Sequence, residues 1–482
     1  MRPLRRILIG LVVTGLALTG CAVEKPRVLN PADRVARPLT VGTFGRVSTT
    51  DPAAATDTGS TVYALNVFQR LMTVQVGSQA LKPDAATDCM YIDELTYTCG
   101  IRRNLSFTNG NDLTASDVKF SIERARTLAV PGSSARLLDL IDDMIVSEDN
   151  PLRIDFKLKQ HDRTFGYALA SPAASIVDED SYKLDELWPQ WQQPVSSGPF
   201  FADVATLDEL RLIRYPRYGG ANGARSLAVA LKMYSTPEAL DRAIATRTVD
   251  VLWRVPASQV PTDGTYEPQT MQGAVVQRLL WNPKSPKRND AALRAWVRDG
   301  TNSLRTLAAA VPPDVNFSEP TFATGGARPT SAVTGEITLG FDPRLPGQEE
   351  LAGQIRDALQ PDVTVHLVAD EEEADVWLSN GQPWTNTTMA WLQPYVEFPL
   401  PDRTAEVRRL ELAFREADGL PRAQEAAAEL QRLMEVDATV VPLSQGDEVF
   451  WMAPDVELDQ EYKNWMGPSW QLGVWGFERV EK

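Results

Sequence analysis

LTYTCGIRRNLSFTNGNDLTASDVKFS (residues 95–121) contains the signals of a strand end, a tight turn and a helix start. Asn109-Gly110-Asn111-Asp112 is typical of a turn, because Asn, Asp and Gly tolerate the backbone angles that turns need. Thr114 with Asp117 three residues later predicts an N-cap with an acid at the N3 position, opening a helix over residues 118–128. The face of this helix that we expect to be buried carries Val118, Ile122 and Ala125.

Two cysteines lie on either side of the turn that precedes this stretch. Cys89 and Cys99 flank β-forming residues around an acidic centre at Asp93-Glu94, a pattern that predicts a hairpin. Directly paired strand residues are close enough for a disulfide. We therefore expect Cys89 and Cys99 to be bonded; the alternative is two buried free thiols.

The third cysteine ends a segment with the features of an export signal. Arg2, Arg5 and Arg6 precede an apolar run, residues 7–17, that is far too short to span a bilayer. Leu18-Thr19-Gly20-Cys21 resembles the lipobox of bacterial lipoproteins, in which the cysteine is acylated (palmitate) and becomes the first residue. Residues 1–20 are then a lipoprotein signal peptide, and Cys21 anchors the chain at the outer face of a bacterial cytoplasmic membrane. The alternative is a plain signal peptide with a chance cysteine.

Composition excludes several function classes. The chain has 482 residues and a formal net charge of −16, so we expect no nucleic-acid partner. The acidic body would also be repelled by anionic lipid headgroups, so the anchor and not charge would hold it at the membrane. Residues 21–38 are rich in proline and charge without periodicity, which predicts a flexible tether.

Beyond the opening stretch, hydrophobic periodicity predicts an α/β fold. A β-α-β unit followed by a further strand favours a parallel sheet flanked by helices. The expected strands are residues 39–44, 152–158, 210–215, 249–253, 335–341, 363–368 and 374–378, and the expected helices are residues 62–72, 239–248, 348–359 and 422–436.

No catalytic or metal-binding motif is present in the sequence. It lacks a glycine-rich phosphate loop, a His-Glu-x-x-His pair and a Gly-x-Ser-x-Gly elbow. Of the two histidines, His161 lies in a charged run typical of a solvated turn, and His366 lies in an apolar strand, where we expect a core residue. The acidic run 370–373 is interpreted as a solvated loop. We expect neither an enzyme nor a cofactor.

The order of these segments resembles the family 5 substrate-binding proteins of bacterial ABC importers, the dipeptide and oligopeptide binders and their relatives. The motifs that carry the resemblance are residues 95–121, Ser197-Gly198-Pro199-Phe200 and residues 238–255. The resemblance covers most of residues 39–255 and returns weakly over residues 335–445. It implies an α/β, two-lobe fold, periplasmic-binding-protein-like (type II, cluster C), with an extra subdomain in the first lobe.

The resemblance also implies a division of the chain into lobes. Lobe I is expected to comprise residues 39–67 with 191–270 and 440–482, the extra subdomain residues 68–190, and lobe II residues 271–439. Such proteins close about a hinge over a ligand and present it to permease subunits. We expect a monomer that binds a peptide or another small solute.

One departure from the family pattern affects the ligand. Peptide binders hold the ligand's α-amine with an aspartate in a loop that here corresponds to residues 379–391, which contain no acid. Burying an unpaired ammonium is costly, so amides and tryptophans in this loop favour a neutral or glycan-like ligand as an alternative to a peptide. Trp281 is expected to be structural. The candidate ligand-binding residues are Trp384, Asn386 and Trp391 from one lobe and Ser48, Thr49 and Ser197 from the other.

Two hypotheses follow. The first is a lipid-anchored solute receptor of an ABC importer, with a peptide as the expected ligand. The second keeps the fold but makes the protein an envelope scaffold or regulatory lipoprotein that binds a glycolipid or a protein partner.

Overall fold

A computed structural model describes residues 37–304, 333–343, 345, 347–381, 383–385, 387–463 and 471–480. From Pro38 onward the chain forms one compact unit. The predicted signal peptide, Cys21 and Asn386 lie outside the described residues.

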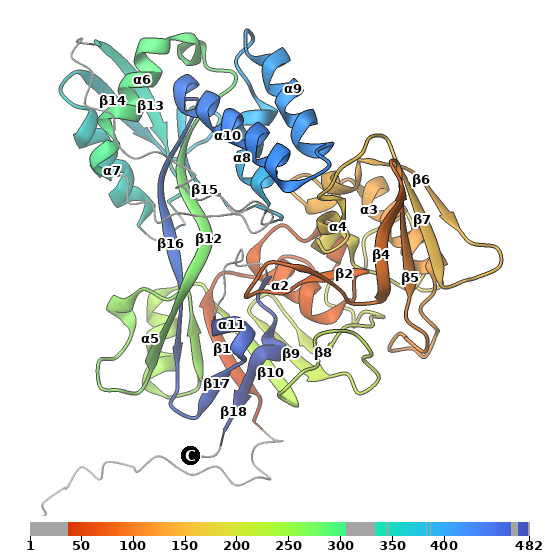
Figure 1. Ribbon diagram of the computed structural model, residues 1–482. Helices are drawn as coiled ribbons and strands as arrows, with labels where there is room; N and C mark the ends of the chain where they lie inside the picture. Colours follow the sequence, from red (N-terminus) through yellow and green to blue (C-terminus); the bar gives the residue numbers. More distant parts are fainter. Residues whose placement is uncertain are drawn as a thin grey trace, which may run out of the picture. The chain divides into compact units, whose positions relative to one another are not determined.

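Ten strands of the described residues form one mixed sheet, in the order β14-β13-β15-β12-β16-β11-β1-β10-β9-β8 (Figure 1). Strand β1 pairs in parallel with β10 and β11, while β13 pairs in parallel with β14 and β15. The strands are β1 (Leu39–Phe44), β8 (Phe200–Ala205), β9 (Glu209–Arg214), β10 (Ala228–Tyr234), β11 (Val251–Trp253), β12 (Glu267–Trp281), β13 (Gly335–Gly340), β14 (Val363–Val368), β15 (Val376–Gly381) and β16 (Val440–Met452).

Two long strands, β12 and β16, join the two ends of this sheet. They pair antiparallel from Glu267↔Met452 to Leu280↔Val440, with irregularities after Gln272 and after Gln277. Strand β11 pairs with one end of β16, and β15 pairs with the opposite end of β12. Figure 1 shows the pair running from the part that contains β1 and β10 to the part that contains β13 and β15. Neither strand was predicted from the sequence pattern.

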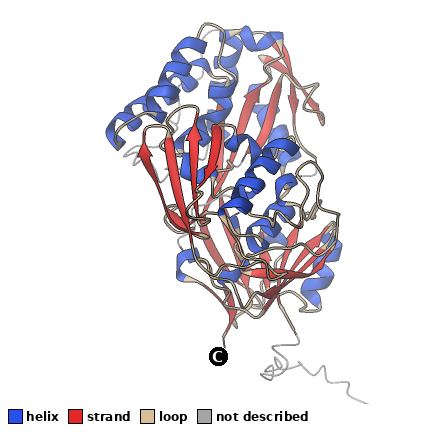
Figure 2. Ribbon diagram, turned by 90° about the vertical axis from the view of Figure 1, so that its right-hand side faces the viewer, coloured by secondary structure: helices blue, strands red, loops and turns tan. Residues whose placement is uncertain are grey.

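A second, antiparallel sheet has the strand order β4-β5-β7-β6, and its strands lie side by side in Figure 2. Its strands are β4 (Ala86–Asp93), β5 (Thr96–Ile101), β6 (Ile141–Val146) and β7 (Arg153–Leu158). Helix α3 (Ala115–Leu128) packs against it through the predicted face of Val118, Ile122 and Ala125. The predicted N-cap is confirmed, since the Thr114 amide donates to Asp117 Oδ2 at 2.8 Å and completes a capping box.

The other elements are short strand pairs and helices that cover the sheets. The short strands are β2 (Met72–Val74), β3 (Leu81–Pro83), β17 (Val456–Leu458) and β18 (Phe477–Arg479). The remaining helices are α2 (Thr58–Val67), α4 (Phe165–Ala168), α5 (Pro237–Ala245), α6 (Ala291–Gly300), α7 (Gln348–Leu359), α8 (Thr388–Glu397), α9 (Thr404–Arg415), α10 (Leu420–Asp437) and α11 (Gln460–Lys463).

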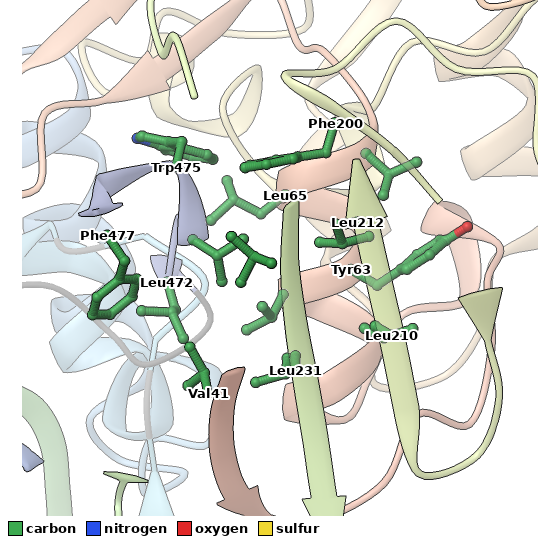
Figure 3. Close-up of a cluster of buried hydrophobic side chains, with 14 of the residues drawn as sticks. Val41, Tyr63, Leu65, Phe200, Leu210, Leu212, Leu231, Leu472, Trp475 and Phe477 are labelled. Carbon is green, nitrogen blue, oxygen red and sulfur yellow. The ribbon is translucent and has the colours of Figure 1, made fainter. Parts of the chain in front are cut away.

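One large apolar core draws its residues from distant parts of the chain (Figure 3). Val41 of β1 and Leu65 of α2 share it with Leu231 of β10 and with Leu472 and Phe477 near the C-terminus. Separate cores lie under the four-stranded sheet, around β13 and α7, and among helices α8, α9 and α10. The predicted β-α-β unit is confirmed as β13, α7 and β14.

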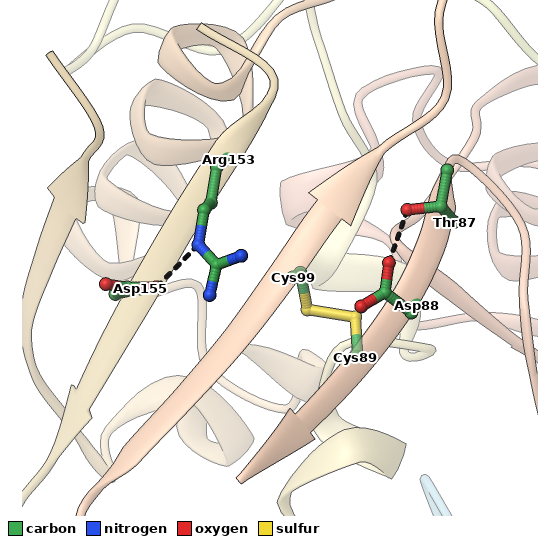
Figure 4. The surroundings of a disulfide bond; sticks show 6 residues. All are labelled: Thr87, Asp88, Cys89, Cys99, Arg153 and Asp155. Carbon is green, nitrogen blue, oxygen red and sulfur yellow. Dashed lines mark hydrogen bonds and ion pairs between the residues drawn. A yellow bond between two sulfur atoms is a disulfide. The ribbon is translucent and has the colours of Figure 1, made fainter. Parts of the chain in front are cut away.

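The predicted disulfide is present. Cys89 of β4 and Cys99 of β5 are directly paired in the ladder, with their Cα atoms 4.2 Å apart and an S–S bond between them (Figure 4). The strands on either side meet at the turn expected near Asp93-Glu94.

Two expectations were wrong. The helix expected over residues 62–72 is α2, which ends at Val67, while Met72 begins β2. The amide of Gly198 donates to the Val67 carbonyl at 2.9 Å, and a side chain at Gly198 would collide with the Val67 backbone. This tertiary contact, which the sequence pattern does not reveal, accompanies the end of the helix.

His366 is the second correction, because it is exposed and not a core residue. Strand β14 lies at the edge of the sheet, and Val363 and Val365 face the core while Thr364 and His366 face solvent. The His366 Nε2 atom lies 3.7 Å from Glu336 Oε2, and both side chains are more than half exposed.

Candidate functional site

A cavity with a volume of ≈ 790 Å³ lies between β12, β15 and α8. Arg278, Leu280 and Trp281 of β12 form one wall, and Trp377 of β15 extends it. Leu137, from the segment that precedes β6, reaches the cavity from the other side. A volume of this size suits a small organic ligand.

A second cavity of ≈ 580 Å³ adjoins the first. It lies between α8 and α9 on one side and residues 132–168 around the four-stranded sheet on the other. The residues that line both cavities are Leu137, Trp384, Thr385, Ala390, Gln393 and Glu397. The two cavities therefore share a wall, and Trp384 is part of it.

Aromatic side chains give the larger cavity an apolar surface. Trp281 and Trp377 come from adjacent strands, while Trp384 precedes α8 and Phe398 follows it. Trp281 is almost fully buried and packs in the core around β13 and α7, so the expected structural role fits its position. Trp384 and Phe398 are partly exposed, so their rings can contact a ligand.

The charges of the larger cavity differ between its wall and its mouth. Glu371 and Glu372 lie on an exposed loop, and Glu397 is paired with Arg136 at 2.9 Å. Arg278 lies deeper, on β12, and burial alone lowers its pKa to about 10. The guanidinium therefore stays protonated at neutral pH and leaves a positive charge in the wall.

Of the candidate ligand-binding residues, Trp384 lines both cavities. Trp391 of α8 is buried against Val276 of β12 and does not line them. Ser48 and Thr49 lie outside both cavities: their amides each donate to Ser60 Oγ at 3.0 Å, and the Ser48 hydroxyl donates to Asp57. Ser197 is fully buried beside the turn that approaches Val67.

Arg278 is the residue that sequence reasoning missed. The signal was a single cation inside the apolar run Val275–Trp281, VVQRLLW, because a charged side chain is seldom buried without a partner.

No cluster of three or more His, Cys, Asp and Glu side chains suitable for a metal ion occurs among the residues that the structure describes. Within the same residues, no helix is long and apolar enough to cross a membrane. His161 Nδ1 lies 2.9 Å from the Glu94 carbonyl oxygen, and its ring packs on Tyr91, away from His366.

Comparison with known proteins now bears on this arrangement. The family model for bacterial extracellular solute-binding proteins, family 5 Middle, matches residues 80–295. The glutathione-binding protein GsiB of Escherichia coli O1:K1 / APEC is 25% identical over 216 residues, which cover 44% of this chain and 39% of that protein. The aligned part of this chain thus spans well under half the length of that relative.

Two solved structures share the fold. DppA, a periplasmic binding protein of Helicobacter pylori in complex with the peptide STSA, has a TM-score of 0.74 and 18% identity, with 92% of this chain and 98% of that chain covered. AgaA of A. tumefaciens R10, in complex with agropinic acid, has a TM-score of 0.74 and 15% identity, with 92% and 99% covered.

These matches confirm the predicted fold class, the α/β two-lobe fold of type II periplasmic binding proteins. Residues 80–295, somewhat less than half of the chain, are thus similar to the family 5 bacterial extracellular solute-binding proteins.

Proposed function

We propose that the protein is a lipid-anchored solute receptor at the outer face of a bacterial cytoplasmic membrane. It captures a small ligand, with a peptide as the expected class, and delivers it to the permease subunits of an ABC importer. The observation that carries this proposal is the ≈ 790 Å³ cavity with its aromatic wall beside the strand pair β12–β16.

The position of the cavity supports binding by closure. We assign residues 39–67, 191–270 and 440–482 to lobe I, 68–190 to its extra subdomain and 271–439 to lobe II. In this division the cavity is lined by residues of lobe II, by Val440 at the start of the last lobe I segment and by Leu137 of the subdomain. A ligand that contacts both sides stabilises the closed state more than the open one, and so shifts the equilibrium towards closure.

Two solved structures with this fold, and one relative in sequence, are described with small ligands. DppA holds the peptide STSA, AgaA holds agropinic acid, and GsiB is described as glutathione-binding. These ligands differ in chemistry, so they support a small polar solute more strongly than they support any one peptide.

The anchor completes the proposal. Acylation of Cys21, followed by a tether to residue 38, would keep the binding unit close to the permease. Several acyl chains on one cysteine make a stable anchor, whereas a single chain binds a membrane only marginally.

One observation favours the second candidate function, an envelope scaffold or regulator that binds a glycolipid or protein partner. Residues 379–391 contain no acid to hold the α-amine of a peptide. A glycolipid headgroup, rich in hydroxyls, would not need one.

Titration of intrinsic tryptophan fluorescence tests the proposal. The full-length chain is titrated with peptide pools and, separately, with an extract of envelope glycolipids. We expect saturable quenching by peptides that Trp384→Ala weakens and that Trp191→Ala, a partly exposed tryptophan outside both cavities, leaves unchanged. If only the glycolipid extract gives saturable quenching, the solute-receptor function is rejected in favour of the envelope scaffold or regulator.

A further inference from the structure

Several buried donors line the larger cavity without an acceptor. Among the described residues, no hydrogen-bond partner is present for Arg278 Nε, Trp281 Nε1 or Arg288 Nε. The Thr439 hydroxyl, also buried in this wall, has no partner either. Indole and guanidinium nitrogens can only donate hydrogen bonds, so the wall offers donors and needs acceptors.

The charge of this wall also favours a ligand that supplies hydrogen-bond acceptors. Arg278 has no ion pair among the described residues, and burial is the one cause that shifts its pKa. Arg288 is held by the Phe398 carbonyl and lies in the field of Asp437, so its charge is partly compensated. The acids at the mouth, Glu371 and Glu372, are exposed to solvent. Lys284 also lines the cavity but is exposed to solvent, so Arg278 is the buried cation of the described wall that lacks a counter-charge.

Packing fixes where the guanidinium of Arg278 lies. A Cβ atom at Gly381, on the adjacent strand β15, would overlap its Nη2, Cζ and Nε atoms. The guanidinium thus lies against the bare Cα of Gly381, which limits its movement on that side. Such confinement suits a fork of N–H donors that must meet two oxygen atoms at once.

We infer that the larger cavity binds a small organic oxyanion, a carboxylate or a phosphate, on Arg278, with the rest of the ligand against Trp377, Trp384 and Phe398. This inference rests on the proposed function and names the ligand class of the same site. The oxyanion supplies acceptors to the unpartnered donors and the counter-charge that Arg278 lacks. The apolar remainder of the ligand covers the aromatic wall, which fits a ligand with one charged end.

Retention of matched compound pools tests the inference. The full-length chain is mixed with N-acetylated amino acids and short N-acetylated peptides that carry free carboxylates, with the same compounds as carboxamides, and with aryl phosphomonoesters. Bound compounds are measured by mass spectrometry after rapid gel filtration. We expect retention of acids or phosphomonoesters and none of the carboxamides. The retained pool tells which oxyanion the site takes.

Variants of the arginine show whether it is the binding group. Arg278→Gln is expected to lower retention about 10- to 100-fold, as loss of a charge-assisted hydrogen-bonding pair does. Arg278→Lys keeps the charge but loses the fork of N–H donors. Its retention of the ligand should therefore lie between that of the wild type and that of Arg278→Gln. Arg153→Gln, the same change at a partly exposed site of β7 outside both cavities, should retain the acids fully.

The melting temperature without ligand separates binding from structure. Because Arg278 lacks a partner there, Arg278→Gln should melt at or above the wild-type temperature, whereas a structural arginine would lower it. Equal retention of acids and carboxamides, or unchanged retention in Arg278→Gln, would contradict the oxyanion site on Arg278. The solute-receptor function would not be affected by that result. If the protein retains none of the pools and no peptide of a protein hydrolysate, both the solute-receptor function and the oxyanion site are contradicted.

Discussion

Arg415, in the last turn of α9, binds the carboxylate of Asp162, in the loop after β7. Both side chains line the second cavity and are largely buried. The Arg163 amide donates to the Arg415 carbonyl at 3.2 Å beside them. In the lobe division proposed above, this ion pair links lobe II to the extra subdomain.

Loss of this link should favour an open state. We expect Arg415→Gln to weaken ligand retention about five- to tenfold, since removal of one partner leaves the nearly buried Asp162 without its counter-charge. Small-angle scattering should show a larger radius of gyration. Glu411→Gln is the control, because Glu411 contacts the same arginine at 2.8 Å from within α9. Unchanged scattering and retention in Arg415→Gln would remove the link from the closing mechanism.

A fully buried ion pair elsewhere should matter for stability. Arg124 of α3 donates to both carboxylate oxygens of Asp51, at 3.0 and 2.5 Å, and the two side chains are 2% and 0% exposed. Arg124→Met leaves a buried carboxylate without its cation, and we expect a loss of about 3 kcal/mol or more in the free energy of unfolding, measured by urea denaturation.

The exposed pair Arg211–Asp203 gives the comparison for this loss. Its charges lie 2.6 Å apart, but both side chains are 42% exposed. Solvent screening limits such pairs to about 1 kcal/mol or less, so Arg211→Met should barely change the urea midpoint. Similar losses of unfolding free energy in Arg124→Met and Arg211→Met would show that burial does not determine how much the Arg124–Asp51 pair stabilises the fold.

Glu448 should make stability depend on pH. This side chain of β16 is 4% exposed, and burial raises its pKa above the usual 4.5, although nearby Arg254 opposes the shift. Between 4.5 and the folded-state pKa, the folded protein holds a proton that the unfolded chain releases. The contribution of Glu448 to stability therefore falls as pH rises through this window.

The isosteric amide tests this pH dependence. Glu448→Gln can still accept the hydrogen bond that Trp253 Nε1 donates at 2.5 Å, but it cannot ionise. Its free energy of unfolding should exceed that of the wild type at pH 7, and the difference should shrink towards pH 4.5. Exposed Glu457, changed to Gln, should show no such trend. A constant difference across this pH range contradicts the raised pKa.

The disulfide should hold an edge strand in place. Strand β4 is at the edge of its sheet, and Met90 and Ile92 on it are about half exposed, so few apolar contacts retain it. We expect Cys89→Ala/Cys99→Ala to cost about 2–3 kcal/mol, the usual cost for a loop of this length. Hydrogen exchange should rise in β4 more than in β7. Equal protection of β4 in the wild type and in the double variant would show that the hydrogen bonds of the ladder alone hold this strand.

The lipid anchor has a direct test by fractionation. Cys21→Ser should move the chain from the membrane fraction to the soluble fraction of cells, because no other cysteine is available for acylation once Cys89 and Cys99 are bonded. The double variant of the disulfide cysteines should stay with the membrane. Retention of Cys21→Ser in the membrane fraction would contradict acylation at this residue.

Local signals explain which parts of the fold could be predicted from sequence. The capping box at Thr114, the hairpin at Cys89 and Cys99, and the β-α-β unit from Gly335 to Val368 each depend on residues close in sequence. The strands β12 and β16 were missed, because Pro268 and Gly273 interrupt one, Pro442 interrupts the other, and bulges break the alternation of the pair.

The candidate site was less predictable for a different reason. Trp384 was found from the composition of its loop, whereas Arg278 is one cation in an apolar strand, and its significance depends on which groups surround it in space. The exposure of His366 likewise follows from the place of β14 at the sheet edge. Strand order is set by long-range pairing, which a single sequence does not record.

The shared core of Val41 and Phe477 has a consequence for biosynthesis. The ribosome makes these two residues more than 400 positions apart, so this core cannot close until the chain has been translated as far as Phe477. Until then β1 and α2 lack the partners that bury them. Such a delay keeps the nascent chain unfolded, and passage through a secretion channel before folding requires an unfolded chain.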